Sequence, residues 1–268
     1  MLPITLPQEL IDLIVDEVAS DRSERVDTLK TCSLVSKSFS QPARTRIFSN
    51  ITIEYNIIYE RRGTKKFDRV EALWNTLQRD PRLARKVCAF ELNLVEVIRF
   101  PRLIGTDYWD WDLSKERIDQ VVLPGIMDTL AEAQRGHTGY RGRLHTLGLG
   151  GYDLFLLDWN RLPSKFQQSW WALCAASTLK YLRVGRMRDF PLTLDIGMKP
   201  LLRRLELVVE LPSSSTTMTL PYAQLASGEG FASLEELECV HLLGWWPPDD
   251  ICTIIAMTCA STLRTLKM

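Results

Sequence analysis

The chain has 268 residues, enough to bury a sizeable core in one large domain or two unequal ones. Hydrophobic residues make up 46% of it and charged residues 25%, both near the averages for soluble globular proteins, which excludes wholesale disorder. Lys plus Arg (33) equals Asp plus Glu (33), so no net charge draws the chain to nucleic acid or to an anionic membrane.

The amino-terminal segment does not have the pattern of a secretory signal, because acidic residues interrupt its apolar run and no basic region precedes it. No apolar stretch reaches the roughly 20 residues that a membrane-spanning helix needs. We therefore expect an intracellular protein, cytoplasmic or nuclear, that binds neither nucleic acid nor membranes. Its six cysteines are scattered, mostly within apolar runs, and predict reduced thiols in the core.

Three short helices are predicted in the first fifty residues. The first starts at Pro7, which suits the first turn of a helix, and carries apolar residues at helical spacing. The second starts near Asp27, a typical N-cap residue, and runs through Val35, and the third has Pro42 near its first turn. So small a bundle cannot bury all of its apolar surface by itself. The sequence therefore predicts that part of this surface contacts another polypeptide.

Three segments between residues 6 and 53 carry a more specific pattern, and they read LPQELIDLIVDEV, LKTCSLVSKSF and PARTRIFSNITI. Together they resemble the F-box, in the form abundant among fungal F-box-like proteins. The resemblance implies that this surface binds a Skp-type adaptor, which links the module to a cullin complex. The adaptor-binding residues that it implies are Leu6, Pro7, Leu10, Ile11, Ile14, Leu29, Leu34, Val35, Ser36 and Phe39. The alternative is that the three helices only cap the domain behind them.

A short motif returns along the rest of the chain, with apolar residues spaced as L-x-x-L-x-L or close to it. This spacing is typical of the strand portion of a leucine-rich repeat. The central leucines of five copies are 35, 23, 32 and 29 residues apart, which predicts an irregular curved solenoid and not a regular horseshoe. These copies lie at 143–150, 178–185, 201–208, 233–240 and 262–268, and a looser copy lies at 87–94.

Helical periodicity is found between several of these predicted strands. The segments are FDRVEALWNTLQRD, SKERIDQVVLPGIMDTLAEAQ, SKFQQSWWALCAAS and DICTIIAMTCAS, and Pro124-Gly125 should kink or split the second. Strands that alternate with helices at this period predict parallel pairing with the helices outside.

The expected fold class is therefore α/β. An N-terminal three-helix F-box-like module (residues 1–53) is followed by an irregular leucine-rich-repeat-like solenoid with parallel strands and outer helices (residues 54–268). The last strand motif reaches Met268, so we expect either a chain that continues further or a partner that covers this strand.

No motif for catalysis, metal binding or cofactor binding is found. The three histidines lie in no HExxH or Cys-x-x-Cys arrangement and near no GxSxG, so we expect neither an enzyme nor a bound metal or cofactor. Gly148, Gly150 and Gly151 fit neither GxGxxG nor GxxxxGK, and they predict the turn after a repeat strand.

Two segments, DYWDWD at 107–112 and GWWPPDD at 244–250, place aromatic residues beside acids or prolines. Exposed aromatics with polar neighbours are typical anchors of protein interfaces, and the alternative is that they close over the core. They predict target-binding residues at Trp109, Trp111, Trp245 and Trp246.

Taken with the resemblance to the F-box, the sequence predicts the substrate receptor of a Skp–cullin–F-box type ubiquitin ligase, in which the helices bind the adaptor and the repeat region holds an unknown protein target. Two alternatives remain, a ligase-independent leucine-rich scaffold and an enzyme with an unfamiliar site.

Overall fold

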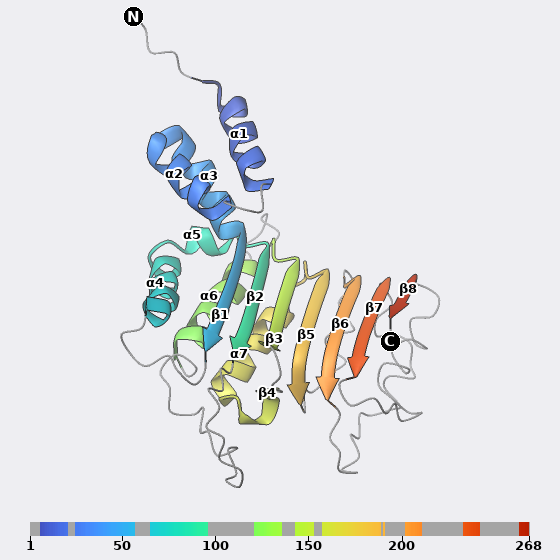
Figure 1. Ribbon diagram of the computed structural model, residues 1–268. Coiled ribbons are helices and arrows are strands. Elements are labelled where there is room, and N and C mark those ends of the chain that lie inside the picture. Colours follow the sequence, from blue (N-terminus) through green and yellow to red (C-terminus); the bar gives the residue numbers. More distant parts are fainter. Residues whose placement is uncertain are drawn as a thin grey trace, which may run out of the picture.

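The computed structural model describes residues 6–20, 25–56, 65–95, 121–135, 143–152, 157–188, 190, 202–210, 233–241 and 263–267. Within these residues the fold is mixed α/β, as predicted. Helices lead into an open sheet of parallel strands, and further helices lie against one face of that sheet (Figure 1). No helix among the described residues combines the length and apolar character needed to cross a bilayer.

The first part of the chain forms a small bundle, which we call the helical module. It consists of α1 (Gln8–Ser20), α2 (Arg25–Val35) and α3 (Lys37–Ser49). Its core is separate from the core under the sheet and contains Ile11, Val15, Leu29 and Ala43. An ion pair of 2.5 Å between Arg46 and Asp16 joins α3 to α1. The module therefore packs around its own interior, as the sequence predicts.

The sheet contains eight strands in the described part of the chain, and all of its pairings are parallel. Its order is β1-β2-β3-β5-β6-β7-β8, so neighbours in space follow one another along the chain, and the short β4 pairs with the end of β5. The strands are β1 (Asn50–Asn56), β2 (Ala89–Val95), β3 (Thr146–Tyr152), β4 (Leu157–Asp158), β5 (Tyr181–Arg188), β6 (Arg204–Glu210), β7 (Glu236–His241) and β8 (Thr265–Lys267).

Every copy of the repeat motif forms one of these strands. The copies at 87–94, 143–150, 178–185, 201–208, 233–240 and 262–268 correspond to β2, β3, β5, β6, β7 and β8. Residue 53, the predicted domain boundary, lies within β1, which pairs with β2 along its whole length. Gly148 and Gly150 lie inside β3 and not in the turn after it, so that part of the prediction is wrong.

Helices occupy the connections between the first strands. They are α4 (Lys65–Arg79), α5 (Pro81–Ala84), α6 (Leu123–Arg135) and α7 (Ser164–Cys174), and a short 3-10 helix (Trp159–Arg161) precedes α7. Figure 1 shows α6 and α7 behind the sheet. Pro124 lies in the first turn of α6, where a missing N–H costs nothing, and residues 121–122 just before α6 are π-helical. The part of the predicted helix before residue 121 lies outside the described residues, so the predicted kink or split at Pro124-Gly125 stays a prediction. The helix predicted near residue 250 lies outside the described residues.

One backbone contact is repeated at the start of successive strands. The carbonyl of the residue just before a strand accepts two hydrogen bonds from the next strand along the sheet. Cys88, for example, accepts from the N–H groups of His145 at 2.8 Å and Thr146 at 3.1 Å. The same arrangement recurs at His145, Lys180, Arg203 and Glu235. Because donors and acceptor occupy equivalent positions each time, the strands begin in register.

This register explains the spacing of the repeat motif. In β5, Leu182 and Val184 are fully buried on the helix side, and they align with Leu147 and Leu149 of β3. The first leucine of the motif lies just before each strand and is also buried, as with Leu179. Residues between these positions face the opposite side of the sheet, since side chains alternate along a strand. We call that side the open face.

A buried glutamine fixes α6 to its neighbours. The Gln134 side chain donates a hydrogen bond of 3.3 Å to the Ala84 carbonyl of α5. Its oxygen accepts from the N–H groups of Arg143 at 2.7 Å and Leu144 at 3.0 Å, just before β3. Gln134 is the acceptor for the two N–H groups, which precede β3, whereas the Ala84 carbonyl also accepts from the Val87 N–H at 3.3 Å.

We expect Gln134→Ala to lower the free energy of unfolding by about 1–3 kcal/mol, because it leaves the buried Leu144 N–H without its partner. Glu132→Ala is the matched control, since Glu132 is exposed on the same helix and should change stability by no more than about 0.5 kcal/mol. Urea unfolding followed by circular dichroism measures both. Equal stability of the two variants would contradict the role given to Gln134.

Candidate functional site

Exposed apolar side chains gather on the helical module. Among the described residues, eight large hydrophobic side chains are exposed, and seven of them belong to the first 35 residues: Leu6, Leu10, Leu13, Ile14, Val26, Leu34 and Val35. We call these seven residues the apolar surface. Such a concentration in so short a segment is typical of a protein interface, because single exposed hydrophobics are normally scattered.

The first helix has apolar residues on two sides. Ile11 and Val15 face the module core and are 4% and 0% exposed, whereas Leu10 and Leu13 point away from it and are 46% and 65% exposed. A helix on the surface of a globular protein normally has one apolar stripe and a polar remainder. The outward stripe of α1 therefore has no role in folding the module.

The end of α2 contributes the most exposed part of this surface. Leu29 is fully buried in the module core, but Leu34 and Val35, in the last turn, are 85% and 67% exposed. The next residue, Ser36, caps α3 by accepting a hydrogen bond from the Phe39 N–H at 3.4 Å. Because α2 ends at Val35 and α3 begins at Lys37, Leu34 and Val35 lie at the turn between the two helices.

The structure divides the ten predicted adaptor-binding residues into two groups. Ile11 and Leu29 are buried in the module core, and Phe39 packs against that core, half-buried. Because Ile11 and Leu29 have almost no exposed area, they stabilise the module and do not contact a partner, which corrects the prediction for them. The exposed members are Leu6, Pro7, Leu10, Ile14, Leu34, Val35 and Ser36. The apolar surface also includes Leu13 and Val26, which are not among the ten predicted residues.

Polar contacts lie on the same two helices as the apolar surface. Lys30 forms an ion pair of 2.9 Å with Asp27, and this hydrogen bond and the positive charge lower the pKa of the Asp27 carboxyl. Gln8 donates a hydrogen bond of 2.9 Å to Asp12, one turn along α1. These contacts are exposed and contribute little to stability. Exposed polar and apolar side chains thus occur together on α1 and α2, as is typical of interfaces.

The four predicted target-binding tryptophans, Trp109, Trp111, Trp245 and Trp246, lie outside the described residues. What the structure does describe on the repeat region is the open face, which is strongly charged. Within the described residues, no group of three potential metal ligands lies close enough to hold a metal ion.

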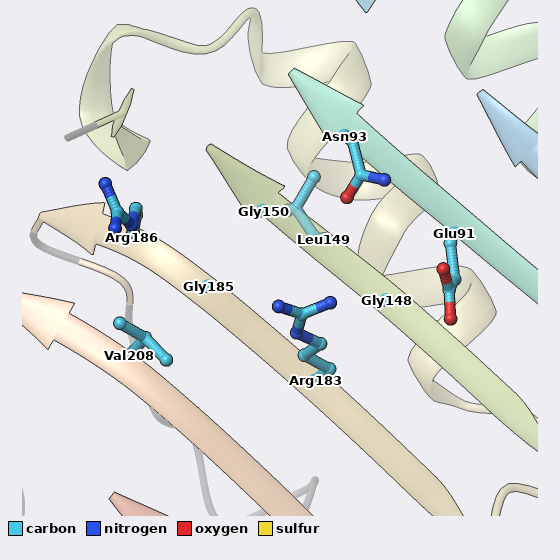
Figure 2. A pocket seen from close by; sticks show the side chains of 9 residues that line it. All are labelled: Glu91, Asn93, Gly148, Leu149, Gly150, Arg183, Gly185, Arg186 and Val208. Carbon is cyan, nitrogen blue, oxygen red and sulfur yellow. The ribbon is translucent and has the colours of Figure 1, made fainter. Parts of the chain in front are cut away.

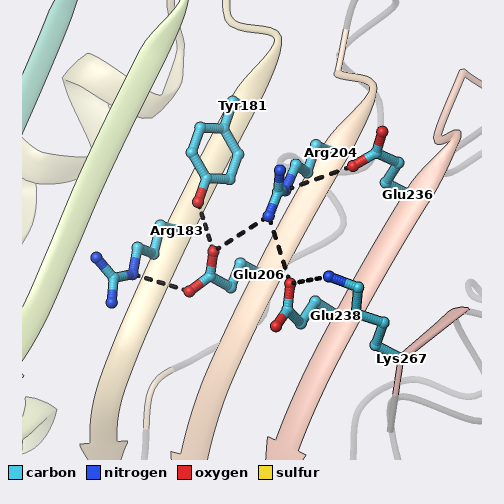
Figure 3. A network of polar contacts seen from close by, with 7 residues as sticks. All are labelled: Tyr181, Arg183, Arg204, Glu206, Glu236, Glu238 and Lys267. Carbon is cyan, nitrogen blue, oxygen red and sulfur yellow. Dashed lines mark hydrogen bonds and ion pairs between the residues drawn. The ribbon is translucent and has the colours of Figure 1, made fainter. Parts of the chain in front are cut away.

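A connected network crosses the open face from β5 to β8 (Figure 3). Glu206 of β6 accepts a hydrogen bond of 2.5 Å from the Tyr181 hydroxyl, and Arg183 binds its other oxygen at 2.9 Å. Burial and the nearby Glu206 carboxylate raise the pKa of Tyr181, so the phenol keeps its proton and donates it. The Arg204 guanidinium lies 5.0 Å from the centre of the Tyr181 ring.

The network continues to the last strands through Arg204. Its guanidinium lies 3.8 Å from Glu206, 3.6 Å from Glu236 and 3.4 Å from Glu238. Lys267 of β8 then pairs with Glu238 at 3.5 Å. Four strands are thus joined by side chains as well as by backbone bonds.

Leu34→Ser should leave the free energy of unfolding within about 0.5 kcal/mol of the native value, because an exposed side chain stabilises little. Leu29→Ala, on the same helix, should lower it by about 2–5 kcal/mol, since it opens a cavity in the module core. Urea unfolding of the full chain compares them. A large loss with Leu34→Ser would show that Leu34 belongs to the core.

A comparison with protein-family models finds no match to this chain, and a comparison with curated proteins finds none either. The apolar surface and the charged open face are the two observations on which a function can be proposed.

Proposed function

We propose that this protein is the substrate receptor of a Skp–cullin–F-box type ubiquitin ligase. The helical module binds a Skp-type adaptor through the apolar surface, and the sheet region holds a protein target. The observation that carries the proposal is the exposure of Leu10, Ile14, Leu34 and Val35, because these residues belong to the segments that resemble the F-box.

The energetics favour a partner on this surface. Burying a Leu, Ile or Val side chain fully contributes about 1.5–3 kcal/mol. The seven residues of the apolar surface are each 42–85% exposed, so covering one of them would contribute about that fraction of its full burial. The sum over the seven residues is of the same order as the cost of association, roughly 4–15 kcal/mol. A partner that covers the whole surface therefore offsets much of this cost, and one that covers only α1 offsets less of it.

The fold proposed for the second part is an irregular leucine-rich-repeat-like solenoid. Three observations support it. The L-x-x-L-x-L motif recurs in successive strands, those strands pair in parallel in chain order, and equivalent backbone bonds start each one. In this proposal the protein catalyses nothing itself. It raises the effective concentration of a target near a modifying enzyme.

Replacing Leu34 and Val35 together by Asp should weaken binding of a purified Skp-type adaptor by about tenfold or more, since two charges would have to be desolvated in the interface. The measurement is co-purification of adaptor with the full chain, followed by titration calorimetry. Both positions are exposed, so the variant should fold normally.

Val121→Asp is the matched control. Val121 is also an exposed hydrophobic residue, 44% accessible, but it lies outside the helical module just before α6. Its substitution should not change adaptor binding. If the folded native chain does not bind the adaptor at all, the receptor proposal is wrong, and a ligase-independent scaffold takes its place. If all three proteins bind equally, the adaptor uses another surface.

A further inference from the structure

A shallow hollow of about 100 Å³ lies on the open face, over β3 and β5 (Figure 2). Its floor is made by Gly148 and Gly150 of β3 and Gly185 of β5, which have no side chains to cover the strands. Arg183 and Arg186 of β5 stand on one side of it. Glu91 and Asn93 of β2 stand on the other. Its size suits the end group of one side chain together with the backbone that carries it.

The backbone does not require glycine at these three positions. None of them has a φ angle in the left-handed region. A Cβ atom added to Gly150 would lie 3.4 Å from the carbonyl oxygen of Gly185, and one added to Gly185 would lie 3.6 Å from the Cα of Gly150. Both are ordinary contacts, so a Cβ fits at Gly150 and at Gly185, whereas one added to Gly148 would lie 3.1 Å from the Cγ of Glu91, which would have to shift. Glycine in a strand destabilises the fold by roughly 0.5–1 kcal/mol relative to alanine. Here the glycines leave the backbone of β3 and β5 uncovered, so another chain can approach it closely.

Arg186 holds its charge at the edge of this hollow. It is the extra residue of a β-bulge, where the pairing of β5 with β6 shifts between Gly185 and Met187, and its φ is 51°. A non-glycine residue with positive φ is uncommon and strained, and such strain often accompanies a functional position. Arg186 is half-buried, and within the described residues no ion pair or hydrogen bond to its guanidinium is found. The bulge therefore presents an unused positive charge.

The charges on the two sides of the hollow are opposite. Arg183 pairs with Glu206 through its Nε and lies beside the hollow in Figure 2, so Arg183 and Arg186 form a positive side. Glu91 faces them across Gly148 and carries no ion pair among the described residues. Two strand spacings, about 10 Å, separate Glu91 from Arg183.

We propose that this hollow binds an acidic side chain, Asp or Glu, of an extended segment of the target protein. The carboxylate pairs with Arg186 and Arg183, since guanidinium groups bind carboxylates with two parallel hydrogen bonds. The segment lies over the glycines, and a basic side chain about three residues along, at about 3.3 Å per residue, reaches Glu91. The inference rests on the proposed function for the idea that the occupant is a protein target.

The test is a selection of displayed random 12-residue peptides on the full chain, without adaptor. The selected peptides should be enriched in Asp or Glu, and synthetic copies should bind at least tenfold more weakly to Arg186→Glu when measured by fluorescence anisotropy. A copy with its acidic residue changed to Lys should lose binding to the native chain and regain it with Arg186→Glu. Arg135→Glu makes the same charge change on an exposed residue of α6 and should bind within twofold of the native chain.

Filling the hollow gives an independent variant. Gly150→Val should remove peptide binding while the chain still folds, because a Cβ at this position meets only ordinary contacts and β-branched residues are favoured in strands. Gly185→Ala serves if Gly150→Val does not fold. The inference is wrong if no peptides are selected, if they are enriched in apolar or basic residues, or if they bind Arg186→Glu and the filled variant as they bind the native chain. Since adaptor is absent, failure here is distinct from failure of adaptor binding.

Discussion

The rest of the structure depends on the register between neighbouring parallel strands. The paired hydrogen bonds accepted by the carbonyls of Cys88, His145, Lys180, Arg203 and Glu235 fix where each strand begins relative to the one before it. Side chains alternate between the two faces of a strand, so a slip of one residue would turn every charged group of the open face into the core. The strand register therefore determines both the burial of the leucines on one face and the formation of the charged network on the other.

The sequence predicts the strands and helices well because apolar spacing reports directly on burial. Phe166, Trp170 and Leu173, for instance, recur at helical spacing, and all are buried in α7. The adaptor contacts that the F-box resemblance implies for Ile11 and Leu29 are not found, because both side chains are buried in the module core. For Ile11, periodicity alone does not show which of the two apolar sides of α1 meets that core. The sequence analysis also does not predict β1, although Ile51 and Ile53 have the spacing of the repeat motif, because both lie inside the segment that resembles the F-box.

The candidate sites on the open face could not be predicted, because they depend on residues far apart in the sequence. Glu91, Gly148 and Arg183 occupy the same position in three copies of the repeat motif, and the register places them side by side on neighbouring strands. The residue at this position differs from copy to copy, so the motif indicates the alignment but not the group of side chains that results. The glycines of β3 predict a turn, since glycine is common in turns, and only the pairing of β3 with β5 shows that they continue a strand.

The junction between the helical module and the sheet has a consequence for how a receptor of this design would work. α3 ends at Ser49 and β1 begins at Asn50, so no linker separates them, and the Ser49 carbonyl accepts a hydrogen bond of 2.7 Å from the Cys88 N–H at the start of β2. The last helix is thus fastened to two strands at once. In a receptor built this way, the protein itself fixes the orientation of a bound target relative to a bound adaptor, because no flexible linker joins the helical module to the sheet. A glycine-rich insertion between Ser49 and Asn50 would leave both binding surfaces intact but would remove this fixed orientation.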